Sequence, residues 1–348
     1  MFSTLSLAFT ALAAANGAFA GFSSGSKRNV AVYWGQNSYG QGSGDLAQQR
    51  LSYYCANTDI DIVPIAFLTV INGQGGQPEI NFSNAGDRCS TFDGTSLLNC
   101  PEIAEDITTC QSQYGKTVIL SIGGATYSEG GFSSTDAAVA GANKVWATFG
   151  PDTGFGALRP FGSASVDGFD FDFEASVSNM APFAQQLRTL MDGAGSSSGR
   201  KFILTAAPQC PYPDAADKEI LENVAMDAVM VQFYNNYCGV NSYVDGAASQ
   251  NNFNFNAWDN WAKTVSKNPE IKVLLGVPAN TGAGAGYVAD LNGVISYSSQ
   301  YSSFGGVMMW DASQAEANSG FVGGVKGDLG SLSRTMKYGF RNNGTAAA

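Results

Sequence analysis

Three carboxylates alternate with three phenylalanines in the stretch FDFDFE, residues 169–174. Successive side chains of a strand point to opposite faces, so Asp170, Asp172 and Glu174 are expected to share one face and the phenylalanines the other. Neighbouring acids on one face lie roughly 6–7 Å apart, and their repulsion raises at least one pKa. Burying such a face is costly unless protons, a ligand or a metal offset the charge. This strand is therefore the candidate centre for acid–base chemistry.

A solvated acidic edge strand is the alternative interpretation. Charged edges do occur, because charge prevents edge-to-edge pairing of sheets. An exposed edge does not need three phenylalanines on its opposite face. The pattern favours a strand whose apolar face is buried and whose acidic face points inward or lines a cleft.

Composition limits which side chains can do the chemistry. The 348-residue chain is 44% hydrophobic, has a net charge of −11 with only 18 lysines and arginines, and contains no histidine. The acidic balance argues against nucleic acid or an anionic membrane as partner. Without histidine, Ser-His-Asp and Cys-His catalysis and His-ligated metals are excluded. We expect carboxylates and tyrosines to act on a neutral substrate, with no metal and no cofactor.

Residues 1–20, MFSTLSLAFTALAAANGAFA, are small, apolar and uncharged, and they end on the A-x-A pattern of a signal-peptide cleavage site. A membrane anchor is the alternative, since no basic residue precedes the apolar run, but this Ala-rich stretch is weakly apolar for a bilayer span. We expect a signal peptide at 1–20 and a secreted mature domain at 21–348 without a membrane segment. Asn81 and Asn343 lie in N-x-S/T sequons and are candidate glycosylation sites.

Six cysteines form an even set that suits an oxidising compartment. None lies in a C-x-x-C pair, so three disulfides are a simpler account than a zinc site. Position along the chain favours the following pairs: Cys55 with Cys110 on two neighbouring helices, Cys89 with Cys100 across one long loop, and Cys210 with Cys238 at the ends of adjacent strands.

Strands and helices alternate along the mature chain. Strands are expected at 30–34, 62–70, 117–121, 166–174, 202–207, 228–234, 272–277 and 306–310. Helices are expected at 44–55, from the Asn99 cap to Gly115, and at 134–149, 179–193, 214–224, 256–266, 287–299 and 324–337. The pattern predicts an α/β fold, a single (β/α)8 TIM barrel. Residues 278–305 leave no room for an α/β insertion domain between strands seven and eight.

Chemistry in such a barrel lies at the carboxyl ends of the strands. Aromatic and amide side chains gather there around the acidic strand, and this combination suits a sugar, because rings stack on sugar faces and amides bind hydroxyls. The strand ends carry Tyr33, Trp34, Gln36, Ser121, Gly123, Gly124, Asp172, Glu174, Gln232, Tyr234, Asn235, Trp310 and Asp311.

These residues resemble glycoside hydrolase family 18, and within it the plant-type, class III chitinases that fungi also secrete. The signature D-G-x-D-x-D-x-E is matched at every fixed position from Asp167 to Glu174. The stretches SIGG (121–124), QFYN (232–235), MWD (309–311) and YWGQN (33–37) are similar to the family's third, sixth, eighth and first strands.

The resemblance implies roles for individual residues. Glu174 would be the general acid, and the substrate's own 2-acetamido group would be the nucleophile, as in the substrate-assisted families. Asp172 would hold the acetamido N–H and share a proton with Asp170, while Tyr234 would bind the acetamido oxygen. The expected substrate contacts are Trp310, Gln232, Asn235, Gln36, Asn72, Gly124 and Ala125. Tyr234 and Trp310 could instead be strand-end core residues.

The implied function is an endo-acting, retaining chitinase, active as a monomer on chitin or chito-oligosaccharides. Two alternatives stay open: an endo-β-N-acetylglucosaminidase acting on N-glycans, and a non-catalytic chitin-binding member of the family. Retention of the terminal acid, Glu174, argues against the non-catalytic alternative.

Overall fold

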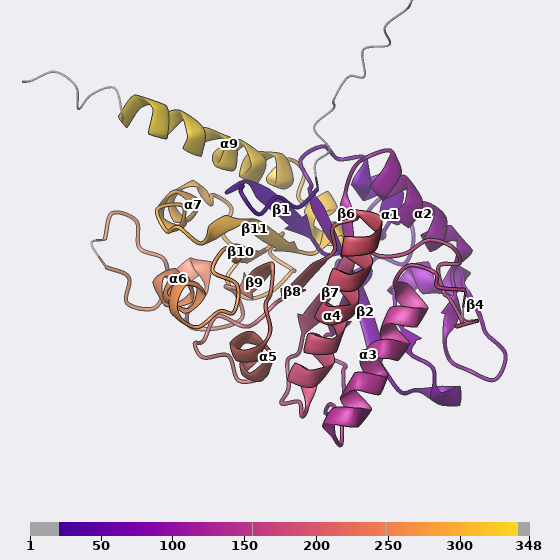
Figure 1. The fold of residues 1–348 in the computed structure, drawn as a ribbon. Helices are drawn as coiled ribbons and strands as arrows, with labels where there is room; N and C mark the ends of the chain where they lie inside the picture. Colours follow the sequence, from indigo (N-terminus) through magenta and orange to yellow (C-terminus); the bar gives the residue numbers. More distant parts are fainter. Residues whose placement is uncertain (1–20, 155, 248, 340–348) are drawn as a thin grey trace, which may run out of the picture.

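The computed structural model describes residues 21–154, 156–247 and 249–339. Its centre is a barrel of parallel strands surrounded by helices (Figure 1). The barrel strands are β1 (Asn29–Val32), β2 (Ile62–Val70), β6 (Thr117–Gly123), β7 (Gly168–Asp172), β8 (Ile203–Ala206), β9 (Ala228–Gln232), β10 (Lys272–Pro278) and β11 (Phe304–Trp310).

The strands pair in chain order, and β1 closes the sheet by pairing with both β2 and β11. Register follows directly from these ladders: Ala31 lies opposite Met308 on one side and Ile62 on the other. A short strand, β3 (Glu79–Ile80), pairs antiparallel with β2 outside the barrel. The expected closed (β/α)8 barrel is therefore confirmed.

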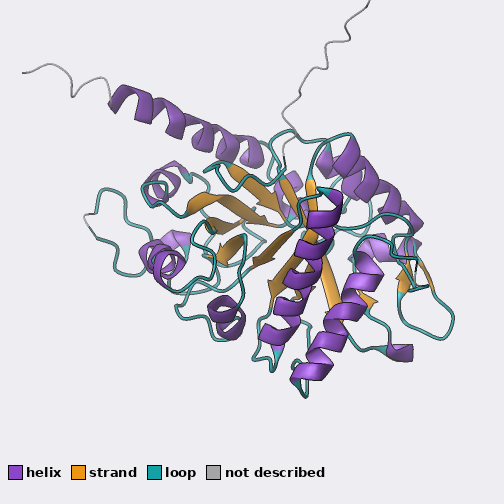
Figure 2. Ribbon diagram, in the orientation of Figure 1, coloured by secondary structure: helices purple, strands orange, loops and turns teal. Residues whose placement is uncertain are grey.

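The helices form an outer layer around the strands (Figure 2). They are α1 (Leu51–Cys55), α2 (Pro101–Ser112), α3 (Thr135–Phe149), α4 (Met180–Ser198), α5 (Lys218–Asn223), α6 (Phe255–Thr264), α7 (Asn292–Ser298), α8 (Ala312–Ala317) and α9 (Phe321–Gly339). Only α7 stands between β10 and β11, so this connection holds no insertion domain.

Alternation along the strands produces two separate cores. One set of side chains packs against the helices and includes Phe169, Phe171 and Phe173, each at most 1% exposed. The other set fills the barrel interior and includes Ala31, Ile119 and Met308. Because β7 alternates strictly, burying its phenylalanines under α3 and α4 turns its carboxylates into the barrel.

Asp167 and Gly168 of the acidic signature hold the start of β7 in place. The Asp167 carboxylate accepts hydrogen bonds from the Val118 amide (2.9 Å) and pairs with Arg200 (2.7 Å). A Cβ on Gly168 would lie 1.8 Å from the Ile203 carbonyl oxygen. Two of the five fixed residues of the signature are thus structural, since they tie β7 to its neighbours.

Three disulfides join Cys55 to Cys110, Cys89 to Cys100 and Cys210 to Cys238. The predicted pairing is confirmed. Cys55 and Cys110 link α1 to α2, which lie side by side (Figure 1). A bridge that closes a long loop stabilises the fold by about 2–4 kcal/mol.

Several predicted helices are shorter in the structure. The segment before α1 is irregular because the side chains of Gln48 and Gln49 bind loop backbone groups instead. Helices α5 and α7 begin later than expected, after turns at 214–217 and 281–291. Helix α4 runs five residues further than predicted, to Ser198, and α8 was not expected.

Other expectations need correction or lie outside the described residues. Asn99 does not cap α2; it pairs with Ser90 in the hairpin β4 (Ser90–Thr91) and β5 (Leu98–Asn99), and the cap position is Cys100. The signal peptide at 1–20 and the sequon at Asn343 lie outside the described residues. Asn81 is exposed. Over the described residues, no helix combines the length and apolarity of a membrane span.

Candidate active site

Asp170 is the deepest acid of the barrel and is fully buried. Its carboxylate accepts hydrogen bonds from three hydroxyls: Tyr33 Oη at 2.6 Å, Ser121 Oγ at 2.7 Å and Thr205 Oγ1 at 2.6 Å. Burial raises the pKa of Asp170, and the three hydroxyls partly offset that effect. Ser121 lies in β6, Thr205 in β8, and Tyr33 directly follows β1, so the closed barrel itself assembles the cradle of Asp170.

Asp172 lies nearer the mouth and is 4% exposed. Gln232 Nε2 donates to Asp172 Oδ1 at 2.8 Å and also to the Ala207 carbonyl at 2.9 Å. Burial raises the pKa of Asp172 well above its usual value, and the charges of Glu174, Asp170 and Asp214 add to the effect. The sequence analysis expects Asp170 and Asp172 to share a proton. In the described part of the chain no hydrogen bond joins the two carboxyl groups directly.

Glu174 follows β7 and is exposed at the pocket mouth. The pocket walls still cover part of its carboxyl, and this desolvation raises its pKa. A raised pKa keeps a carboxylic acid protonated to higher pH, as a general acid requires. The two mouth acids therefore differ in surroundings: Asp172 is enclosed and hydrogen-bonded, and Glu174 is open to a ligand.

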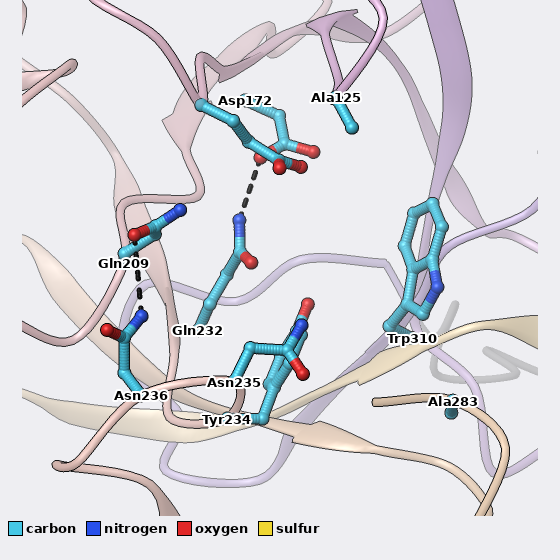
Figure 3. Close-up of a pocket in the computed structure, with 10 residues that line it drawn as sticks. Ala125, Asp172, Gln209, Gln232, Tyr234, Asn235, Asn236, Ala283 and Trp310 are labelled. Carbon is cyan, nitrogen blue, oxygen red and sulfur yellow. Dashed lines mark hydrogen bonds between the residues drawn. The ribbon is translucent and has the colours of Figure 1, made fainter. Parts of the chain in front are cut away.

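A pocket of about 240 Å³ opens over these acids (Figure 3). Two acids, four amides, two aromatic rings and two alanines form its walls. The lining residues are Ala125, Asp172, Glu174, Gln209, Gln232, Tyr234, Asn235, Asn236, Ala283 and Trp310.

Tyr234 and Trp310 are the aromatic side chains of this pocket. Tyr234 is 6% exposed, and burial followed by the charges of Asp172 and Glu174 raises its pKa well above the usual value. Its hydroxyl therefore stays protonated and can donate a hydrogen bond. Trp310 stacks on Phe67 with ring centroids 5.9 Å apart. A half-buried indole fixed in this way presents a flat apolar surface to the pocket.

Two predicted contact residues, Gln36 and Asn72, lie outside the pocket lining. Gln36 Nε2 donates to the carbonyls of Ala66 (2.8 Å) and Asn81 (3.0 Å), which ties the loop after β1 to β2. Asn72 Oδ1 accepts from Lys144 Nζ at 2.6 Å. Both side chains form hydrogen bonds within the protein that join loops to neighbouring elements, and neither lines the pocket.

Three other predicted contacts lie at the pocket or beside it. Ala125 and Asn235 line it, and Gly124 precedes Ala125. The Gly124 amide donates to the Asp172 carbonyl at 2.7 Å, which joins the β6 loop to β7. Asn235 Oδ1 accepts from the Ala285 amide at 2.7 Å, so this residue also fixes the loop after β10.

Gln209, Asn236 and Ala283 line the pocket but were missed from the sequence. Gln209 follows the predicted strand 202–207, whose carboxyl end would have indicated it by the same rule that selected the other strand ends. Asn236 directly follows the selected residue Asn235. Ala283 could not be predicted from the sequence, because nothing distinguishes its methyl group from those of the other alanines in this Gly/Ala-rich loop.

The chain matches the model of "Glycosyl hydrolases family 18" over residues 29–299. It is 54% identical over 330 residues to a class III chitinase of Arthroderma benhamiae, covering 93% of this chain and 92% of that protein. It is 51% identical over 314 residues to endochitinase 33 of Trichoderma harzianum, covering 89% and 94% of the two chains. The crystal structure of a chitinase from Ipomoea carnea superposes with a TM-score of 0.67 at 30% identity, covering 86% of this chain and 99% of that one. This chain, in which the barrel strand β7 carries carboxylates that point into the barrel, belongs to the glycosyl hydrolases of family 18.

Proposed function

We propose that this protein is an endo-acting chitinase that hydrolyses β-1,4-linked N-acetylglucosamine polymers with retention and substrate assistance. The observation that carries the proposal is the contrast between its two mouth acids. Glu174 is exposed and has a raised pKa, whereas Asp172 is enclosed and held by Gln232. The names of the fungal relatives, a class III chitinase and an endochitinase, point to the same activity.

In the first step, Glu174 protonates the glycosidic oxygen as the bond to the anomeric carbon breaks. The carbonyl oxygen of the substrate's 2-acetamido group attacks that carbon and forms an oxazolinium ion. The Asp172 carboxylate accepts a hydrogen bond from the acetamido N–H and stabilises the positive charge of the oxazolinium ion. The Tyr234 hydroxyl donates a hydrogen bond to the acetamido oxygen. Water, deprotonated by the Glu174 carboxylate, then opens the oxazolinium ion and restores the acid.

The surroundings of the acids favour the substrate as nucleophile over a protein carboxylate. In most retaining glycosidases a second carboxylate attacks the anomeric carbon directly and must reach it. Asp170 is fully buried and Asp172 is 4% exposed, with one oxygen bonded to Gln232. Both are better positioned to stabilise charge than to form a bond with sugar.

An exchange of Glu174 for glutamine tests the assignment. Glu174→Gln keeps the size of the side chain but removes the transferable proton, so hydrolysis of colloidal chitin should fall roughly 10²- to 10⁴-fold. Glu270→Gln is the matched control, because Glu270 is exposed and its carboxylate makes no hydrogen bond or ion pair in the described residues. Near wild-type hydrolysis by Glu174→Gln would refute the assignment.

The endo mode rests on the openness of the site. The only regular element between β10 and β11 is the seven-residue helix α7, so no insertion wall rises beside the pocket over that connection. Long chito-oligosaccharides should give products of mixed length from the first time points. Disaccharide alone from the start would contradict the endo mode.

The alternatives are separated by substrate. Release of an N-glycan, without cleavage of chitin, would indicate an endo-β-N-acetylglucosaminidase, and binding without cleavage would indicate a non-catalytic member. Export of the enzyme also belongs to the proposal, supported by the three disulfides, which persist in oxidising compartments. A monomeric state is proposed with it.

A further inference from the structure

The position of Glu174 depends on the chain around it, because within the described residues its carboxyl makes no hydrogen bond. On one side of it, the Phe173 ring packs edge-on against Tyr127 with ring centroids 5.0 Å apart. On the other side, the Ser178 amide donates to the Gly130 carbonyl at 2.9 Å. Both contacts are made to the loop between β6 and α3, so this loop holds the segment that carries Glu174.

The contact at Ser178 involves the backbone on both sides. The Ser178 carbonyl accepts from the Phe132 amide at 2.8 Å, and a Cβ on Gly131 would lie 2.1 Å from the same oxygen. Asn179 Nδ2 donates to the Phe132 carbonyl at 2.6 Å. The loop between β6 and α3 therefore packs backbone to backbone against the segment after Glu174, and a shift of one moves the other.

Glu129 ties this loop to β2. Its carboxylate accepts hydrogen bonds from two backbone amides directly after β2, that of Ile71 and, at 2.9 Å, that of Asn72. Ile71 is fully buried, so loss of the carboxylate would leave its amide without an acceptor and away from water. Glu129 directly precedes Gly130, so this anchor lies where the loop meets the segment after Glu174.

The beginning of the same loop has a separate anchor. The Gly124 amide donates to the Asp172 carbonyl at 2.7 Å, and the Tyr127 amide donates to the Gly124 carbonyl at 3.0 Å. Ala125, the loop residue that lines the pocket, lies between these contacts. Loss of the Glu129 side chain should therefore release the end of the loop and leave the pocket wall at Ala125 in place.

We propose that Glu129 is a positioning residue for the reaction. Through the loop between β6 and α3, it holds Glu174 where the carboxyl can protonate the glycosidic oxygen. Glu129 is not among the residues that line the pocket, so it acts through Glu174 and not on the sugar. A misplacement of about 1 Å at a reacting group can cost roughly 100-fold in rate. This inference rests on the proposed function and adds to it what fixes the general acid in place.

The test compares two substrates that need the acid to different extents. The leaving sugar of chitohexaose departs as an alkoxide unless Glu174 protonates it, whereas an aryl chitobioside with an acidic phenol needs no proton. Glu129→Ala should lower kcat/KM roughly 10- to 100-fold for chitohexaose, mainly through kcat, and less than about threefold for the aryl glycoside. Glu129→Gln should restore part of the loss, because its amide oxygen can still accept from one backbone amide.

Glu79→Ala is the matched control. Glu79 is half-buried like Glu129 and also accepts a backbone amide, that of Gln74 at 3.1 Å, but it holds the loop between β2 and β3. Its kcat/KM should stay close to wild type on both substrates. A double variant, Glu129→Ala with Glu174→Gln, should lose no more than Glu174→Gln alone, because no acid is left to misplace. Urea unfolding of each variant verifies that the assays use folded protein.

Three results would overturn the inference alone, given an active wild type. They are an unchanged kcat/KM for chitohexaose in Glu129→Ala, equal losses on the two substrates, and a further loss in the double variant. A selective loss on chitohexaose in Glu79→Ala would also overturn it, because that residue holds a different loop. A wild type that cleaves neither substrate would overturn the proposed function and this inference with it.

Discussion

Replacing Thr205 by valine removes one of the three hydroxyls that hold Asp170 and keeps the side chain's shape. Thr205 Oγ1 donates to Asp170 Oδ1 at 2.6 Å, while Tyr33 and Ser121 both bind Oδ2. The substitution therefore leaves Oδ1 without its hydroxyl donor at a fully buried carboxylate.

The size of the effect follows from the chemistry of the lost contact. A hydrogen bond to a charged group contributes about 1.5–3 kcal/mol. Because one pKa unit corresponds to about 1.36 kcal/mol, losing this bond should raise the pKa of Asp170 by about 1–2 units. The direction adds to the effect of burial, which already raises this pKa.

The pH dependence has a definite sign. In the unfolded chain Asp170 ionises near its usual pKa of about 3.9. Thr205 stabilises the ionised form of Asp170. Thr205→Val should therefore lower the free energy of unfolding least in acid, where the folded carboxyl is protonated, and most at pH values above the raised folded pKa. The acid limb of the activity profile should move to higher pH by the same amount.

Urea unfolding of wild type and Thr205→Val at about pH 3 and pH 8, together with kcat/KM against pH, measures both effects. Thr189→Val is the matched control, because the Thr189 hydroxyl binds only the Gln185 carbonyl on the exposed face of α4. Equal destabilisation at both pH values, or an unmoved acid limb, would refute the reasoning.

Two further predictions concern buried and close-packed positions. Asp217 is fully buried, and within the described residues neither of its carboxyl oxygens has a hydrogen-bond partner. Burial, followed by the charge of Asp214, raises the pKa of Asp217 well above the usual value. Asp217→Asn should therefore raise the urea midpoint at pH 7 but much less at pH 3, and the exposed control Asp87→Asn should leave it unchanged. At Gly124, φ is +78° and a Cβ would lie 2.7 Å from the Phe67 ring, so Gly124→Ala should destabilise the protein by more than Gly130→Ala, which has φ of +68° and nothing within 4 Å. Backbone strain alone accounts for about 1–2 kcal/mol in each, and equal losses in the two variants would contradict the clash.

Periodicity in the sequence was enough to predict the barrel fold and the inward direction of the carboxylates of the acidic strand. Eight apolar strands alternating with helices allow few arrangements other than a barrel, and strict alternation from Phe169 to Glu174 permits only one set of faces. Burial of the phenylalanines against the helices then forces the acids inward. The cysteine pairs could also be predicted, because their positions on neighbouring elements left little choice.

Only the tertiary structure decided which polar side chains reach the pocket. Gln36 and Gln232 both follow the same strand-end rule, yet Gln36 binds loop carbonyls while Gln232 holds Asp172. The partners of Asp170 likewise lie in β6 and β8 and directly after β1, which are distant from one another in sequence. A sequence pattern records which face a residue occupies, but hydrogen-bond partners depend on loop paths and on which strands become neighbours when the barrel closes.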